Sequence, residues 1–117
     1  MLKEAELFKA LSDPTRLRLV TLLAIEGETC VCDLAAALDE PDYKISRHLG
    51  ILRSGGLVEA RREGAWMHYR LAEKRNDLEK CLVGCLRDCL AGHPDVRGDL
   101  ERLESAQSAK GAECDGQ

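Results

Sequence analysis

The chain has 117 residues, 44% hydrophobic but only 3% aromatic, so it can close one modest core and has no room for a separate catalytic domain. Its net charge of −4, taken alone, argues against binding of nucleic acid, because the phosphate backbone favours clustered lysines and arginines. No stretch approaches the roughly 20 apolar residues that span a bilayer, and the first residues lack the apolar core of a signal peptide. We therefore expect a cytoplasmic protein with no membrane contact.

Two helices are predicted at the N-terminus. Apolar residues recur at helical spacing between residues 5 and 11. Asp13 and Pro14 then predict the N-cap and first turn of a second helix, because the fixed φ of proline suits the first helical position. Gly27 suits the C-terminal turn of that helix.

Two shorter helices joined by a tight turn are predicted next. Thr29 is expected to cap a third helix that runs to Leu38 and carries two cysteines in its first turn. Residues 40–42 make the turn, and Asp42 is expected to cap a fourth helix over residues 42–54. The buried stripe of this fourth helix is predicted to be Ile45, Leu49 and Leu52.

A β-hairpin and a last long helix complete the predicted fold. Residues 57–63 and 66–71 read as two short strands about Gly64. A long helix is predicted over residues 76–90. The fold class is therefore mainly α-helical with a small β-hairpin.

Residues 94–117 are predicted to be a C-terminal tail outside the domain formed by residues 1–93. Two leucines allow a weak helix up to Ser105. Beyond it the residues are small and polar, so we expect partial disorder there, with Cys114 exposed.

The order of two short helices and then a basic hairpin is that of a winged helix-turn-helix, whose second helix enters the major groove of DNA. Residues 40–75 hold eight lysines and arginines against five acids, whereas residues 76–117 hold five against nine. The middle of the chain is therefore the candidate DNA-binding face. No nucleophile, base and orienting group occur together, which argues against an enzyme.

Candidate DNA-contacting residues lie on the polar face of helix 42–54 and on the hairpin. We predict that Arg47 and His48 lie near base edges and that Lys44 and Ser46 contact phosphates. Arg61 and Arg62 of the hairpin are placed at the backbone or the neighbouring minor groove. The full predicted DNA-binding set is Tyr43, Lys44, Ser46, Arg47, His48, Arg61 and Arg62.

Four motifs in this order resemble the arsenic-responsive repressors of the ArsR/SmtB family over roughly residues 5–90. They are Ala-Leu-Ser-Asp-Pro-Thr-Arg-Leu-Arg at 10–18, Cys-Val-Cys-Asp-Leu at 30–34, Lys-Ile-Ser-Arg-His-Leu at 44–49 and Gly-Ala-Trp-Met-His-Tyr-Arg-Leu at 64–71. The resemblance implies a homodimer built on the first and last helices. It also implies a palindromic double-stranded operator, and derepression when As(III) or Sb(III) binds cysteine thiolates.

Cys30 and Cys32 match the arsenic-binding motif of that family. Thiols in the first turn of a helix lie at the positive end of its dipole, which favours the thiolate. In a regular helix, however, residues two apart point about 200° away from each other. We therefore hypothesise that ion capture distorts the start of this helix, shifts it against helix 42–54 and moves the two reading helices of the dimer out of register with DNA.

The third ligand of such an ion is open. The commoner arsenic motif has a cysteine three residues after the second one, where this chain has Ala35. Two thiolates and an exogenous group are one solution. A sulfur from Cys81, Cys85 or Cys89 of either chain is another.

The last three cysteines are spaced by four residues on one face of the predicted last helix. The outer pair lies about 12 Å apart along a straight helix, so one ion cannot bind all three. We weigh two readings equally: a second thiolate site, or small residues that pack the dimer seam.

Two other kinds of repressor and one protein of another class are the alternatives to the arsenic-responsive repressor. One is a repressor controlled by thiol–disulfide exchange, because a reducing compartment makes redox sensing a common use of cysteine. The other is a cadmium or lead sensor, disfavoured because the first 29 residues contain no cysteine. A thiolate-rich metal carrier that retains the winged fold would bind no specific DNA.

Overall fold

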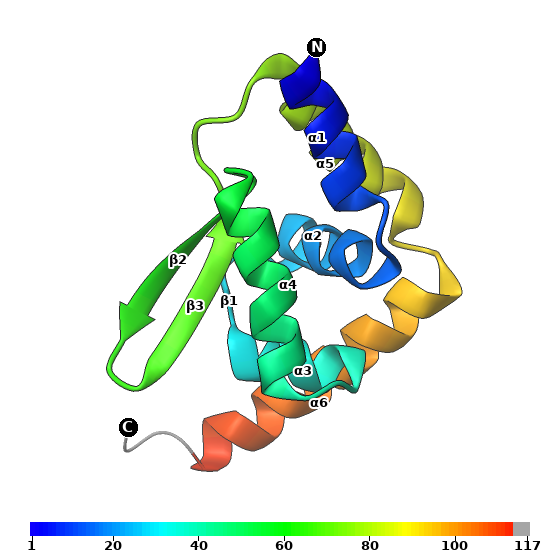
Figure 1. Ribbon diagram of the computed structural model, residues 1–117. Coiled ribbons are helices and arrows are strands. Elements are labelled where there is room, and N and C mark those ends of the chain that lie inside the picture. The colour runs from blue at the N-terminus through cyan, green and yellow to red at the C-terminus, as the bar shows by residue number, and fades with distance from the viewer. Residues whose placement is uncertain (114–117) are drawn as a thin grey trace.

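The computed structural model describes the backbone of residues 1–113 and the side chains of residues 1–109 (Figure 1). The chain forms α1 (Leu2–Leu11), α2 (Pro14–Glu26), β1 (Thr29–Cys30), α3 (Val31–Leu38), α4 (Asp42–Ser54), β2 (Val58–Glu63), β3 (Trp66–Leu71), α5 (Asp77–Leu90) and α6 (Pro94–Glu113). The strands form an antiparallel sheet in the order β1-β3-β2. This is the predicted winged helix-turn-helix, with one short strand, β1, that the sequence analysis missed.

Local signals explain most of the helix boundaries. The Asp13 side chain accepts a hydrogen bond from the backbone N–H of Arg16, 3.0 Å away, and Pro14 begins α2 as predicted. Gly27 ends α2 with a φ of 78°, a conformation that glycine adopts without steric cost. Asn76 and Glu79 form a reciprocal capping box at the start of α5.

Two predicted caps are wrong. Thr29 lies in β1, where its hydroxyl donates to the carbonyl of Gly27, and the N-cap of α3 is Cys30 instead. The N-cap of α4 is Pro41, and Asp42 is the first helical residue. Helix α3 begins at Val31, so Thr29 lies one position before the N-cap and its hydroxyl bonds to Gly27 instead.

The core is built around α2, which contacts α1, α4, α5, α6 and β3 (Figure 1). Its middle residues are fully buried, and the predicted stripe of α4 packs against them. The largest buried apolar side chains are Leu19, Leu22, Leu23, Leu34, Ile45, Leu49, Leu52 and Leu103. This arrangement holds α3 and α4 in one position relative to the centre of the domain.

The predicted tail contains a helix, α6, that continues beyond Ser105, where partial disorder was expected. Helix α6 runs to Glu113 and packs against α3 and α2. Val96 and Leu103 are buried there, so the apolar area that they remove from water stabilises the helix in spite of its polar composition. Cys114 lies outside the described residues.

A buried carboxylate fixes α6 against the two helices beneath it. Asp99 is fully buried and accepts hydrogen bonds from Arg18 of α2 at 2.6 and 2.9 Å and from Arg102 at 2.8 Å. Arg102 also donates to the carbonyl of Ala37 in α3, 2.7 Å away. The buried charge is thus fully partnered, as burial requires. No helix among the described residues is long and apolar enough to cross a membrane.

The packing of α6 predicts the effect of truncating its buried leucine. Leu103→Ala should lower the free energy of unfolding by about 2–5 kcal/mol, because it leaves a cavity between α6 and α3. Urea unfolding at a fixed protein concentration measures this change. The exposed neighbour Glu104 is the matched control, since Glu104→Ala should change stability by no more than about 0.5 kcal/mol. Equal effects of the two substitutions would show that α6 is not docked.

Candidate DNA-binding surface and thiol sites

The N-terminal half of α4 forms the exposed surface that the sequence analysis assigned to DNA. Tyr43 is 73% exposed, and Ser46 and Arg47 are exposed beside it. Lys44 is half-buried, and its ammonium group lies 3.0 Å from the carboxylate of Glu40. Tyr43, Ser46 and Arg47 therefore point outward as predicted, while the charge of Lys44 is already paired.

His48 does not lie on an exposed face, contrary to the prediction. His48 is only 8% exposed, and its side chain faces the start of α2. Its Nδ1 lies 3.4 Å from Nη1 of Arg16 and 4.0 Å from Oδ1 of Asp13. Position 48 follows the buried Ile45 by three residues and precedes the buried Leu52 by four, so the imidazole packs inward with this stripe.

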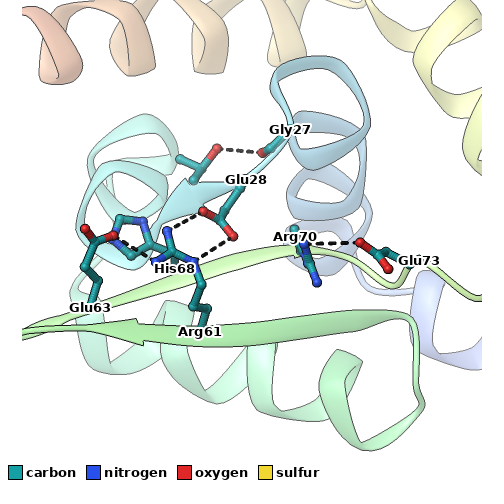
Figure 2. A network of polar contacts seen from close by, with 8 residues as sticks. Gly27, Glu28, Arg61, Glu63, His68, Arg70 and Glu73 are labelled. Atoms are coloured by element: carbon teal, nitrogen blue, oxygen red, sulfur yellow. Dashed lines mark hydrogen bonds and ion pairs between the residues drawn. The ribbon is translucent and has the colours of Figure 1, made fainter.

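The wing, strands β2 and β3, carries the two arginines that were predicted to contact DNA, and these two differ in their ion pairing. Arg61 donates to both carboxylate oxygens of Glu28, at 2.7 and 3.3 Å, and to Glu63 at 2.9 Å. Figure 2 shows Arg61 reaching from β2 to Glu28, just before β1. Arg62 is exposed and has no ion pair among residues 1–109. Arg62 is the freer cation of the wing.

The Glu28–Arg61 pair joins the segment before β1 to the wing. The hydrogen bond from Arg61 lowers the pKa of Glu28, so the pair stays ionised around neutral pH. An exposed pair of this kind contributes little stability. Its effect is to hold the two segments together, and because the partners are 33 positions apart in the sequence, no local pattern predicted the pair.

Cys30 and Cys32 come together without any unwinding of α3. Their sulfur atoms lie 2.9 Å apart. Cys30 is extended, with φ −68° and ψ 143°, and is 3% exposed, whereas Cys32 lies in the first turn of α3. The predicted 200° divergence applies only when both residues are helical, so the geometric conflict behind the distortion hypothesis is absent.

A third ligand for this pair is not supplied within the described part of one chain. Asp33 Oδ1 lies 4.0 Å from the sulfur of Cys32. No group of three or more His, Cys, Asp or Glu side chains among the described residues is arranged to hold an ion. Figure 1 shows α5 at one end of the described chain and α3 at the other, so the α5 cysteines do not lie near Cys30 within a chain.

The three cysteines of α5 are all exposed. The sulfurs of Cys85 and Cys89 lie 3.8 Å apart. A hydrogen bond with Cys89 raises the pKa of the Cys85 thiol. These residues are therefore outside the core of the chain, and two of them are in contact.

Burial makes His48 a source of acid sensitivity. Burial lowers the pKa of His48 from its ordinary 6.5, and Arg16 and Arg47 act in the same direction against the pull of Asp13. The unfolded chain then binds a proton at higher pH than the folded chain, so stability falls as the pH drops below about 6.5. His48→Gln should show a smaller loss of unfolding free energy between pH 7.5 and 5.5 in urea titrations. An equal loss in both proteins would contradict this assignment.

Comparison with known proteins agrees with this geometry. The family model for the bacterial regulatory protein, arsR family, matches residues 13–60. The arsenical resistance operon repressor of Escherichia coli K12 is 57% identical over 67 residues, which are 57% of this chain and 57% of that repressor. An uncharacterized HTH-type transcriptional regulator of Methanocaldococcus jannaschii is 48% identical over 73 residues, 62% of this chain and 82% of the relative.

A solved structure shows the same fold. It is the homodimeric winged helix-turn-helix DNA-binding domain of a possible ArsR-family regulator from Mycobacterium bovis, 39% identical with a TM-score of 0.61. The match covers 79% of this chain and 85% of that one. The E. coli match, by contrast, spans little more than half of the repressor's length.

Proposed function

Since the chain belongs to the arsR family of bacterial regulatory proteins, we propose that it is a homodimeric repressor that leaves its operator when As(III) or Sb(III) binds Cys30 and Cys32. The observation that carries the proposal is the 2.9 Å approach of these two sulfurs at the start of α3, the helix that packs against α4. The E. coli relative is described as an arsenical resistance operon repressor. That description supports arsenic as the inducer.

The DNA-binding part of the proposal rests on α4 and the wing. Tyr43, Ser46 and Arg47 project from the end of α4 that reaches base edges in helix-turn-helix proteins. Arg62 is suited to a phosphate or to the minor groove. Lys44 and Arg61 first have to exchange their carboxylate partners for phosphates, so we assign them a smaller share of the binding.

The dimer is proposed to form on α1 and α5. Leu2 and Phe8 of α1 are 75% and 52% exposed in the single chain. Large exposed apolar residues of this kind mark an interaction surface. The homodimeric M. bovis domain supports a second copy of this chain as the partner.

Two thiols suffice to hold trivalent arsenic by exchange of its hydroxyl groups. In the proposed reaction, As(OH)₃ and two thiols give a bis(thiolato)arsenic hydroxide and two water molecules, and arsenic keeps its oxidation state. The exogenous hydroxyl takes the place of a third sulfur, which fits the presence of Ala35.

Coupling to DNA is proposed to run through the two elements that the sulfurs join. Cys30 belongs to β1, which pairs with β3 of the wing, and Cys32 belongs to α3, which contacts α4. An ion bonded to both sulfurs fixes the angle between β1 and α3, and thereby the wing and the reading helix. This replaces the unwinding of α3 as the source of the switch. A coupling of about 1–3 kcal/mol weakens operator binding about 5- to 150-fold.

Replacement of Arg47 tests whether the exposed face of α4 contacts the operator. Arg47→Ala should weaken binding to an operator selected from a random duplex library by about 1–3 kcal/mol, because a side chain at a base edge is lost. Titration by fluorescence anisotropy at several salt concentrations measures the affinity and the salt slope. Arg53→Ala removes the same charge from the far end of α4 and should have a smaller effect. A larger loss in Arg53→Ala would overturn the placement of α4.

Replacement of Cys30 and Cys32 tests whether these two thiols are the arsenic sensor. The fully reduced native protein should lose about 5- to 150-fold in operator affinity on addition of arsenite. Cys30→Ser/Cys32→Ser should bind the operator as the native protein does, and arsenite should no longer release it. Cys81→Ser is the control for loss of a thiol elsewhere.

The same sulfur separation also suits oxidation of the two thiols to a disulfide, so the assay needs a redox arm. Peroxide in metal-free buffer would accept the two electrons, and dithiothreitol would reverse the step. Release by peroxide with no effect of arsenite on the reduced protein would favour the redox-controlled repressor. Release of Cys30→Ser/Cys32→Ser by arsenite would refute the sensor assignment.

A further inference from the structure

The Glu28–Arg61 pair occupies a guanidinium that the wing would otherwise offer to DNA. Nε and Nη2 of Arg61 donate to the two carboxylate oxygens of Glu28, at 3.3 and 2.7 Å, and Nη1 donates to Glu63 at 2.9 Å. All three guanidinium nitrogens are thus bonded to carboxylates (Figure 2). One cation surrounded by two anions repels a phosphate, so a phosphate binds Arg61 only after a carboxylate has left.

Glu28 lies where the wing meets the proposed sensor. It precedes Cys30 by two residues, and the intervening Thr29 is already part of β1. His68 of β3 is paired with Cys30 of β1 on one side and with Arg61 of β2 on the other. Directly opposed residues of antiparallel strands share one face of a sheet, so these three form a row across it. The carboxylate that holds Arg61 is therefore attached, through two residues of backbone, to the sensor end of this row.

The pair is free to open in the proposed dimer. Figure 1 shows the wing well away from α1 and α5, on which the dimer is proposed to form. The side chains of Glu28 and Arg61 are 30% and 49% exposed, so water or a phosphate can reach both. An exposed ion pair contributes little stability, so its opening costs little. Arg61 therefore has two accessible partners, Glu28 within the chain and a phosphate outside it.

We propose that Glu28 is a built-in competitor of DNA phosphate for Arg61, and that the Cys30–Cys32 pair acts on the wing through this carboxylate. The proposal rests on the proposed function, from which it takes the DNA and the ion. An ion bonded to both sulfurs holds β1 against α3 and keeps the Glu28 carboxylate at Arg61. DNA draws Arg61 away from it. The two ligands thus favour opposite states of one contact, which is the physical requirement for coupling between their sites.

The first arm of the test measures the competition without arsenite. Glu28→Gln keeps the size of the side chain and removes its charge. It should raise the affinity for DNA about 2- to 30-fold, because two exposed pairs, one in each chain of the dimer, no longer have to open. The gain should be equal on the selected operator and on a random-sequence duplex, since phosphate contacts carry no sequence information. Fluorescence anisotropy measures both affinities, and circular dichroism confirms that the variant is folded.

A double-mutant cycle separates the contact from a general change of charge. Removal of any negative charge strengthens attraction to DNA over a distance. Glu26 is exposed two residues before Glu28 and carries the same charge, so Glu26→Gln measures this general effect. In the Arg61→Ala background, Glu28→Gln should give no more than that general gain, because the competitor no longer has a cation to hold.

The second arm adds arsenite to the reduced protein on the operator. The factor by which arsenite weakens operator binding should be about 2-fold or more smaller in Glu28→Gln than in the native protein, since the competing carboxylate is missing. Both thiols are intact in this variant. Arsenic bound per chain, measured by mass spectrometry after desalting, should therefore equal that of the native protein.

Three results would overturn the proposal. They are weaker DNA binding by Glu28→Gln, which means that Glu28 prepares Arg61 for DNA, an equal gain with and without Arg61, and an undiminished release by arsenite. A native protein that arsenite does not release refutes the proposed function instead. The first arm uses no arsenite and includes a random-sequence duplex, so it still decides whether Glu28 competes with DNA.

Discussion

The short pairing of β1 with β3 is the constraint on which the rest of the proposed mechanism depends. It holds Thr29 opposite Tyr69 and Cys30 opposite His68, so the backbone at Cys30 is extended up to the residue where α3 begins. A thiol at an extended N-cap position and a thiol in the first helical turn can then meet, as they do at 2.9 Å. Backbone hydrogen bonds therefore prepare the sulfur pair before any ion is present, which lowers the cost of binding.

The same pairing places the thiols between the two elements proposed to contact DNA. One side of the pair belongs to the sheet of the wing, and the other begins the helix that packs on α4. Behind α3, helix α6 is fixed through Asp99 and Arg102, so the body of α3 has little freedom. An ion that binds the two sulfurs therefore alters the angle between β1 and α3 more easily than it moves α3 against the core.

An acidic chain can present a basic surface because many of its charged side chains pair with each other, which leaves the charge of the remaining arginines unpaired. Lys44 and Arg61 are paired with carboxylates, and Arg18 is committed to the buried Asp99. Arg47 and Arg62 are exposed on the face proposed for DNA. The net charge of −4 thus says little about binding, which depends on where the unpaired cations lie.

The sequence by itself determined the order of the helices, the β2–β3 hairpin, the buried stripe of α4 and the spacing of the two groups of cysteines, because these follow from periodicity, turn residues and spacing within a few positions of each other. Only the tertiary structure decided the state of Cys30, the burial of His48, the partner of Arg61 and the docking of α6. Each of these depends on a contact between segments far apart in the chain: β1 with β3, α4 with α2, Glu28 with β2, and α6 with α3. Local propensity predicts which elements form, but the burial and charge pairing that fix these side chains arise only when the elements pack.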